Sequence, residues 1–279
     1  MHPRIALPLF FALVLALAAT LVPAAPSQAL TPLPTQPLII VDLTQGYLVG
    51  AAHMDAWLDG EMAAAQVHPK MNYNLYTLYR MGPPAIGGAP EQSAVEVCPE
   101  TWSVPLTLTS VPSGHIIALG NVDFDPQPRM PEALPVTSET YRGFVADFLR
   151  SQGLQNPEVR IDQLMRIDIE GDGVDEVLIT ATRLSDEMWT ISPGDYSVVL
   201  LRTVQGNQAV TTMLSGEIYP RGEEFAAPNM YTIAGLLDLD RDGVLEILMA
   251  SRYYEGSSIM VLGKFVDGWQ LLLNAGCGL

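Results

Sequence analysis

The sequence predicts a mostly β protein with one clear α-helix. Short runs of β-branched and aromatic residues recur along most of the chain, and clusters of Gly, Pro and polar residues separate them. Only one segment shows a clear helical spacing of apolar residues. The C-terminal half repeats one pattern, which predicts propeller-like four-stranded repeats there and a small β domain in the N-terminal half. With 48% hydrophobic residues, the chain of 279 residues is long enough to bury one sizeable core or two small ones.

Residues 1–29 have the pattern of a secretory signal peptide. A basic lead, MHPR, precedes a long apolar run, and SQA ends at Ala29 as a small-x-small cleavage pattern. We therefore expect a secreted, periplasmic or cell-envelope protein. An uncleaved membrane anchor is the alternative, because the apolar run is long enough for one. Residues 30–36 predict a Pro-rich linker, and no later stretch approaches the length of a transmembrane helix.

Residues 37–120 predict the N-terminal β domain. The segments PLIIVDL, GYLVGAA, NYNLYTLYRM, WSVPLTLT and HIIALG each combine β-forming residues with alternation, and the Pro- and Gly-containing stretch MGPPAIGGAPEQS separates two of them. Residues 121–137 contain DFDPQPRMPEALPV, whose four prolines predict a connection or a long surface loop.

We predict the helix at residues 138–153. Ser138 is a candidate N-cap and Gly153 a candidate terminator. An apolar stripe at three-and-four spacing is expected to pack on a sheet; it comprises Tyr141, Phe144, Val145, Phe148 and Leu149.

We predict two β repeats within residues 154–279. DIEGDGVDEV begins at Asp168 and DLDRDGVLEI begins at Asp238, 70 residues later. Each unit contains a strand, an acidic loop and three further strands, which is typical of a propeller blade. Two units are too few to close a ring, because propellers need about four or more blades.

Both loops carry the residues of a calcium site. Oxygen ligands at positions 1, 3 and 5, a backbone carbonyl at position 7 and an acid at position 9 converge when glycine at position 6 permits a sharp turn. The candidate metal ligands are Asp168, Glu170, Asp172, Val174 and Glu176 in the first loop, and Asp238, Asp240, Asp242, Val244 and Glu246 in the second. Acidic β-turns that bind nothing are the alternative, since Asp-Gly is also a favoured hairpin turn.

The loop pattern resembles the FG-GAP and VCBS repeats of integrin-α-like propellers. An EF-hand is excluded, because its acid at position 12 is replaced by Ile179 and Met249. The resemblance covers roughly the last 120 residues and implies a β fold with metal-binding loops. Glu170 replaces the usual Asp or Asn, Arg241 replaces the glycine common at position 4, and the FG-GAP residues themselves are absent.

Cys98 and Cys277 are the only two cysteines. An exported chain with an even cysteine count favours a disulfide between them, and two free buried thiols are the alternative.

Composition and motifs restrict the function. The net charge of −17 arises from 14 basic against 31 acidic residues, which disfavours nucleic acid and anionic membranes as partners. His53, His68 and His115 form no metal-ligand spacing, and no nucleophile elbow or phosphate-binding loop is present. We therefore favour an exported, non-enzymatic calcium-binding protein with a binding or adhesion role toward an unknown protein or carbohydrate. The alternative is a secreted, polysaccharide-acting hydrolase with its active site in the N-terminal β domain, which requires clustered acids or a His-centred site in a cleft.

Overall fold

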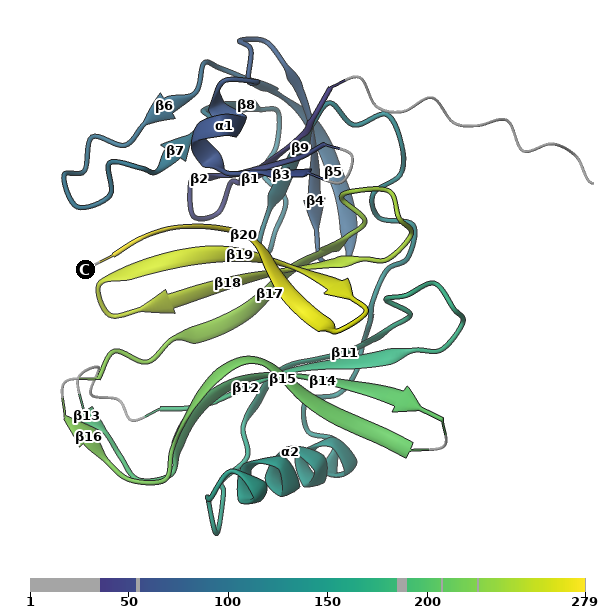
Figure 1. Ribbon diagram of the computed structural model, residues 1–279, viewed down its shortest axis with the longest axis vertical. Coiled ribbons are helices and arrows are strands. Elements are labelled where there is room, and N and C mark those ends of the chain that lie inside the picture. The colour runs from purple at the N-terminus through teal and green to yellow at the C-terminus, as the bar shows by residue number, and fades with distance from the viewer. Residues whose placement is uncertain (1–35, 54–55, 185–189, 207, 225, 279) are drawn as a thin grey trace, which may run out of the picture. The chain divides into compact units, whose positions relative to one another are not determined.

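The computed structural model describes residues 36–53, 56–184, 190–206, 208–224 and 226–278. The expected signal peptide, residues 1–29, lies outside the described residues, as does the expected linker except for its last residue. Pro34–Leu279 forms one compact unit. As the sequence predicted, the described chain is mostly β, with antiparallel strand pairing and few helical residues (Figure 1).

The N-terminal part forms a seven-stranded sheet. Its strand order is β3-β2-β1-β9-β4-β5-β8, and every neighbouring pair is antiparallel. The strands are β1 (Leu38–Asp42), β2 (Tyr47–His53), β3 (Ala56–Leu58), β4 (Asn72–Thr77), β5 (Arg80–Gly87), β8 (Leu106–Leu108) and β9 (Ile117–Gly120). A separate short pair consists of β6 (Glu91–Gln92) and β7 (Trp102–Ser103).

Two elements of this part differ from the sequence prediction. The stretch beginning MGPP was expected to separate strands, yet it lies in β5. The pairing of β4 with β5 shifts between Asn74 and Tyr76, so Pro83 faces no paired residue and its missing N–H costs no ladder bond. The short helix α1 (Gly60–Ala64) was not predicted; Asp59 caps it by accepting a hydrogen bond from the Met62 N–H at 2.9 Å.

Helix α2 (Glu139–Ser151) follows the Pro-rich connection, which contains the short strand β10 (Glu132–Ala133). The Ser138 side chain makes no capping bond, but its carbonyl accepts from the Arg142 N–H at 3.0 Å. Val145 and Leu149 are fully buried, and Tyr141 and Phe148 pack on the same core cluster. The expected apolar stripe therefore packs on a sheet.

The C-terminal part contains two antiparallel meanders that begin alike. The first forms a five-stranded sheet in the order β10-β11-β12-β14-β15, and the second a four-stranded sheet in the order β17-β18-β19-β20. The first meander comprises β11 (Ile161–Ile167), β12 (Glu176–Arg183), β14 (Asp195–Gln205) and β15 (Gln208–Tyr219). The second comprises β17 (Met230–Leu237), β18 (Glu246–Tyr253), β19 (Gly256–Phe265) and β20 (Gly268–Cys277). Between them, β13 (Thr190–Ile191) pairs with β16 (Glu223–Glu224).

The second meander shares a core with each of the other two sheets. One cluster joins Ile40 and Leu119 of the N-terminal sheet to Val261 of β19, and another joins Leu178 of β12 to Ile247 of β18. The other face of the N-terminal sheet packs on α1, and the other face of the first meander packs on α2 (Figure 1). None of the described sheets closes into a ring, so the propeller-like arrangement is not confirmed.

A disulfide joins Cys98, in the connection between β6 and β7, to Cys277 at the end of β20. The Cα atoms lie 5.5 Å apart, and Cys98 is buried. The bond spans 179 residues and therefore links the N-terminal part to the last strand.

Candidate metal centre

The two acidic loops occupy equivalent places in the meanders. Asp168 follows β11, and Asp238 follows β17. Glu176 and Glu246 are the first residues of β12 and β18. Each loop therefore spans the turn between the first two strands of its meander, and its position 9 is fixed by a strand.

The same backbone hydrogen bonds shape both loops. The acid at position 9 accepts from the N–H at position 2: Glu176 from Ile169 at 2.8 Å, and Glu246 from Leu239 at 2.7 Å. The aspartate at position 1 accepts from the glycine at position 6, at 2.9 Å in the first loop and 3.2 Å in the second. The aspartate at position 5 accepts from the valine N–H at position 7, at 2.8 Å and 2.7 Å. These hydrogen bonds to carboxylates hold both loops in a curled form without a bound ligand.

Positions 4 and 6 of both loops have a left-handed backbone. Position 6 is Gly173 with φ of 85° and Gly243 with φ of 88°. Position 4 is Gly171 with φ of 72° in the first loop, but Arg241 with φ of 71° in the second. Glycine adopts this conformation without strain, whereas a residue with a Cβ atom is strained by roughly 1–2 kcal/mol. Arg241 therefore keeps the loop conformation despite its side chain.

Contacts of the Arg241 guanidinium offset this strain. It lies 4.3 Å from the centre of the Phe124 ring and forms an ion pair with Asp123. A cation over an aromatic face is stabilised by roughly 0.5–1 kcal/mol at exposed sites. The departure from glycine therefore leaves the second loop folded like the first.

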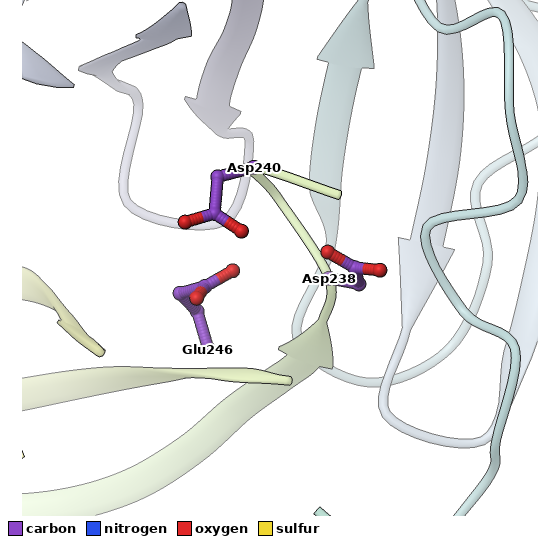
Figure 2. Close-up of side chains that lie close together, drawn as sticks. All are labelled: Asp238, Asp240 and Glu246. Atoms are coloured by element: carbon purple, nitrogen blue, oxygen red, sulfur yellow. The ribbon is translucent and has the colours of Figure 1, made fainter. Parts of the chain in front are cut away.

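The second loop brings three predicted ligands together. Asp238, Asp240 and Glu246 each offer an oxygen, and these oxygens all lie within 4.8 Å of one another. Figure 2 shows the carboxylates of Asp240 and Glu246 turned toward one another, with Asp238 beside them. Glu246 and Asp238 are buried, with 3% and 7% of their surface exposed. Within the described ranges, this is the only such group of His, Cys, Asp or Glu side chains.

Burial and mutual repulsion oppose ionisation of this group. Burial, followed by repulsion from Asp240, raises the pKa of Glu246 to about 9, although the Leu239 N–H lowers it. Burial and the charge of Asp242 raise the pKa of Asp240 to about 6, and burial also raises the pKa of Asp238. A cation among these oxygens removes both obstacles at once, because it replaces the lost solvation and screens the repulsion.

The first loop has a different electrostatic environment. Glu170, at position 3, forms an ion pair with Lys264 of β19, one of only two lysines in the chain. Asp172 and Val174 are exposed, whereas Glu176 is buried, which raises the pKa of its carboxyl group. Lys264 therefore already supplies one positive charge to this loop.

The other seven predicted ligands remain outside the carboxylate group; they are Asp242 and Val244 in the second loop, and Asp168, Glu170, Asp172, Val174 and Glu176 in the first. Asp242 is exposed, and its Oδ1 accepts from the backbone of Val244. Val174 and Val244 hold position 7 as predicted, but the hydrogen bonds found there involve their N–H groups and not the carbonyls that the prediction uses.

Arg129 links the two loops, a contact that the sequence did not predict. Its guanidinium donates to the carbonyls of Asp168 at 2.7 Å and Ile169 at 3.1 Å in the first loop, and to that of Gly243 at 2.6 Å in the second. The Leu245 N–H also donates to the Ile169 carbonyl at 3.0 Å. The loops are thus neighbours. An arginine within a Pro-rich connection gave no signal of this role, because its partners are backbone atoms from two distant segments.

A tryptophan lies near each loop. Trp57 of β3 lines a cavity together with Asp240 and Glu246. Trp269 of β20 lines another cavity together with Glu170 and Glu176. The two loops therefore have different tryptophans nearby.

Comparisons with known proteins assign no family to the chain. No family model matches it, and neither the curated proteins nor the solved structures yield a match. Among the described residues, no helix has the length and apolar character needed to cross a membrane.

Proposed function

We propose that the protein is an exported calcium-binding protein, with its higher-affinity site in the second acidic loop. The observation that carries this proposal is the convergence of oxygens from Asp238, Asp240 and Glu246 within 4.8 Å. Carboxylate oxygens are preferred ligands of hard cations, and a loop of irregular geometry suits calcium better than magnesium, which demands a near-ideal octahedron. Position 5, Asp242, and the carbonyl of Val244 would complete the shell as the loop adjusts around the ion.

The first loop supplies a second, weaker site. Its ligands would be Asp168, Glu170, Asp172, the carbonyl of Val174 and Glu176. Calcium must displace Lys264 from Glu170 before this carboxylate becomes a ligand. The proposal therefore orders the sites, with the second loop filled before the first.

The ion has a structural role in this proposal. Arg129 and the bond between Leu245 and Ile169 join the loops, so calcium at one loop stiffens the contact between the two meanders. We further propose a non-enzymatic binding or adhesion role in the cell envelope or outside the cell, with FG-GAP/VCBS-like and propeller-like repeats. The repeated meanders, the disulfide and the leader pattern of residues 1–29 support this role.

Thermal unfolding in chelator and then in calcium tests the proposal. Calcium at 100-fold excess over the dissociation constant stabilises a folded protein by about 2.7 kcal/mol. For a chain of this size, each kcal/mol raises the melting temperature by roughly 2–4 °C. Asp240→Asn should remove most of this rise, whereas Glu96→Gln, at an exposed acid in the connection between β6 and β7, should leave it unchanged. An equal melting temperature in chelator and calcium would contradict the proposal.

A further inference from the structure

A cavity of about 550 Å³ lies away from both acidic loops, beside the turn that connects β1 and β2. Its wall also includes parts of β17, β18 and β19 and the residue two positions before β9. The polar side chains of this wall are Thr44, Gln45, His115, Thr232, Ser251, Arg252 and Ser257. Its volume falls in the range of small-molecule sites.

A buried carboxylate orients the histidine of this wall. The Nε2 atom of His115 lies 2.8 Å from Oδ1 of Asp42, and the Asp42 side chain is completely buried. The same Oδ1 accepts from the backbone N–H groups of Thr44 and Gln45 at 2.9 Å and 3.1 Å. Asp42 therefore fixes the imidazole ring, and an Nε2–H donated to the carboxylate leaves Nδ1 as an acceptor. Among the described residues, Nδ1 has no hydrogen-bond partner.

Arg252 is the only formally charged side chain among the described residues that line the cavity. The chain has 31 acidic and 14 basic residues, yet no Asp or Glu lines this cavity. Arg252 is exposed and forms no ion pair with any described residue. Its guanidinium is a planar donor that matches a carboxylate.

The remaining wall groups both donate and accept hydrogen bonds. The Ser257 hydroxyl lies 3.0 Å from the Tyr47 hydroxyl, and the Thr44 hydroxyl accepts from the Ile116 N–H at 2.8 Å. Thr232 is exposed on β17. Such groups suit a ligand that carries several hydroxyls.

We propose that this cavity binds a small hydroxylated carboxylate of the size of a sugar acid. The ligand carboxylate pairs with Arg252, one ligand hydroxyl donates to Nδ1 of His115, and others bond to Thr232 and Ser257. Asp42 is a positioning residue, because it acts through His115. The site is independent of the calcium-binding proposal, since no residue of either acidic loop lines it.

Calorimetric titration of the full chain with D-glucuronate and with D-glucose tests this inference. The two sugars differ by the carboxylate, so glucuronate should bind and glucose should bind at least about tenfold more weakly, as expected for loss of a charge-assisted hydrogen bond. Arg252→Met should reduce glucuronate affinity to the level of glucose. Arg221→Met, at another exposed arginine, should leave glucuronate affinity unchanged.

Two further variants test the hydrogen-bonding groups that the inference assigns to ligand hydroxyls. Thr232→Val keeps the side-chain shape at an exposed position and should weaken glucuronate binding without changing the melting temperature. His115→Gln keeps a donor for Asp42 and should also weaken glucuronate binding. Absence of glucuronate binding, equal binding of both sugars, or full affinity in Arg252→Met would each overturn the inference.

Discussion

The two acidic loops have the same hydrogen-bonded framework but different surroundings. In both, Glu at position 9 and Asp at position 1 accept from backbone N–H groups at the same positions. In the first loop, Lys264 pairs with Glu170, and most of the loop is exposed. In the second loop, three carboxylates meet in a partly buried group.

The comparison indicates that the shape of a loop and its need for a cation have different physical causes. Hydrogen bonds from backbone N–H groups to the carboxylates fix the shape, and they need no metal. Burial determines how strongly the loop requires a cation, because buried like charges repel and lose solvation. A shared sequence motif therefore predicts a shared loop but not shared electrostatic surroundings.

Removing Arg129 should have the largest effect, because it breaks the connection between the loops. Arg129→Met leaves the carbonyls of Asp168, Ile169 and Gly243 without their guanidinium partner. We expect a loss of about 2–4 kcal/mol in the free energy of unfolding, measured by urea denaturation in calcium. Arg221→Met is the matched control. A loss no larger than in this control would mean that Arg129 does not hold the loops together.

Stability of the calcium-free protein should depend on pH through the second loop. The pKa of Glu246 rises from 4.5 to about 9 on folding, so the unfolded chain releases this proton first as pH increases. The contribution of the Glu246 carboxyl group to the free energy of unfolding is therefore complete below about pH 4.5 and is lost as pH rises toward 9. Asp240, with a pKa of about 6, adds to the loss in the lower part of this range.

Melting temperatures between pH 5 and pH 9 check this dependence. In chelator they should fall as pH rises, and calcium should flatten the curve because it binds the ionised carboxylates. Glu246→Gln should reduce the slope in chelator, since its amide does not titrate. A flat curve in chelator for the unaltered protein would be inconsistent with the buried carboxylate group.

The paired variants Glu246→Gln and Glu176→Gln compare the loops at the same position. Both amides keep an acceptor for the N–H at position 2, so the framework should survive. We expect Glu246→Gln to weaken the tighter calcium site by about tenfold or more, as loss of a charged ligand implies. Glu176→Gln should change only the weaker site. Calorimetric titration of both variants distinguishes these effects, and the reverse pattern would exchange the roles of the loops.

Replacing Lys264 should have the smallest effect. Lys264→Met removes the cation that pairs with Glu170, both side chains being about one-third exposed. Exposed pairs contribute about 0.2–1 kcal/mol, which corresponds to a gain of at most about fivefold in calcium affinity at the first loop. The second loop should keep its affinity. A calorimetric titration in which the weaker site loses affinity would show that Lys264 supports this loop and does not compete with calcium.

The sequence predicted elements whose signals are local. The apolar stripe of α2 and the apolar, β-forming runs of β1, β2 and β9 needed no tertiary information. Both acidic loops were also placed correctly between strands, because glycine at position 6 and acids at alternate positions act within one turn.

The sequence could not predict features that depend on distant contacts. Pro83 lies within β5 because a register shift in the pairing with β4 spares its missing N–H. Arg129 bonds to carbonyls on both loops, and Arg241 keeps a left-handed backbone with Phe124 and Asp123 as partners. The motif also does not show that only the second of the two loops brings three carboxylates together. In the first loop, Lys264 pairs with Glu170 instead.

Tryptophan-sensitised terbium luminescence tests the assignment of the tighter calcium site to the second loop, because terbium replaces calcium at oxygen sites and a different tryptophan lies near each loop. Trp57 shares a cavity with Asp240 and Glu246, and Trp269 shares one with Glu170 and Glu176. We expect calcium-displaceable emission whose first phase disappears in Trp57→Phe and whose second phase disappears in Trp269→Phe. Absence of displaceable emission, or a first phase that depends on Trp269 instead, would contradict the assignment of the tighter site to the second loop.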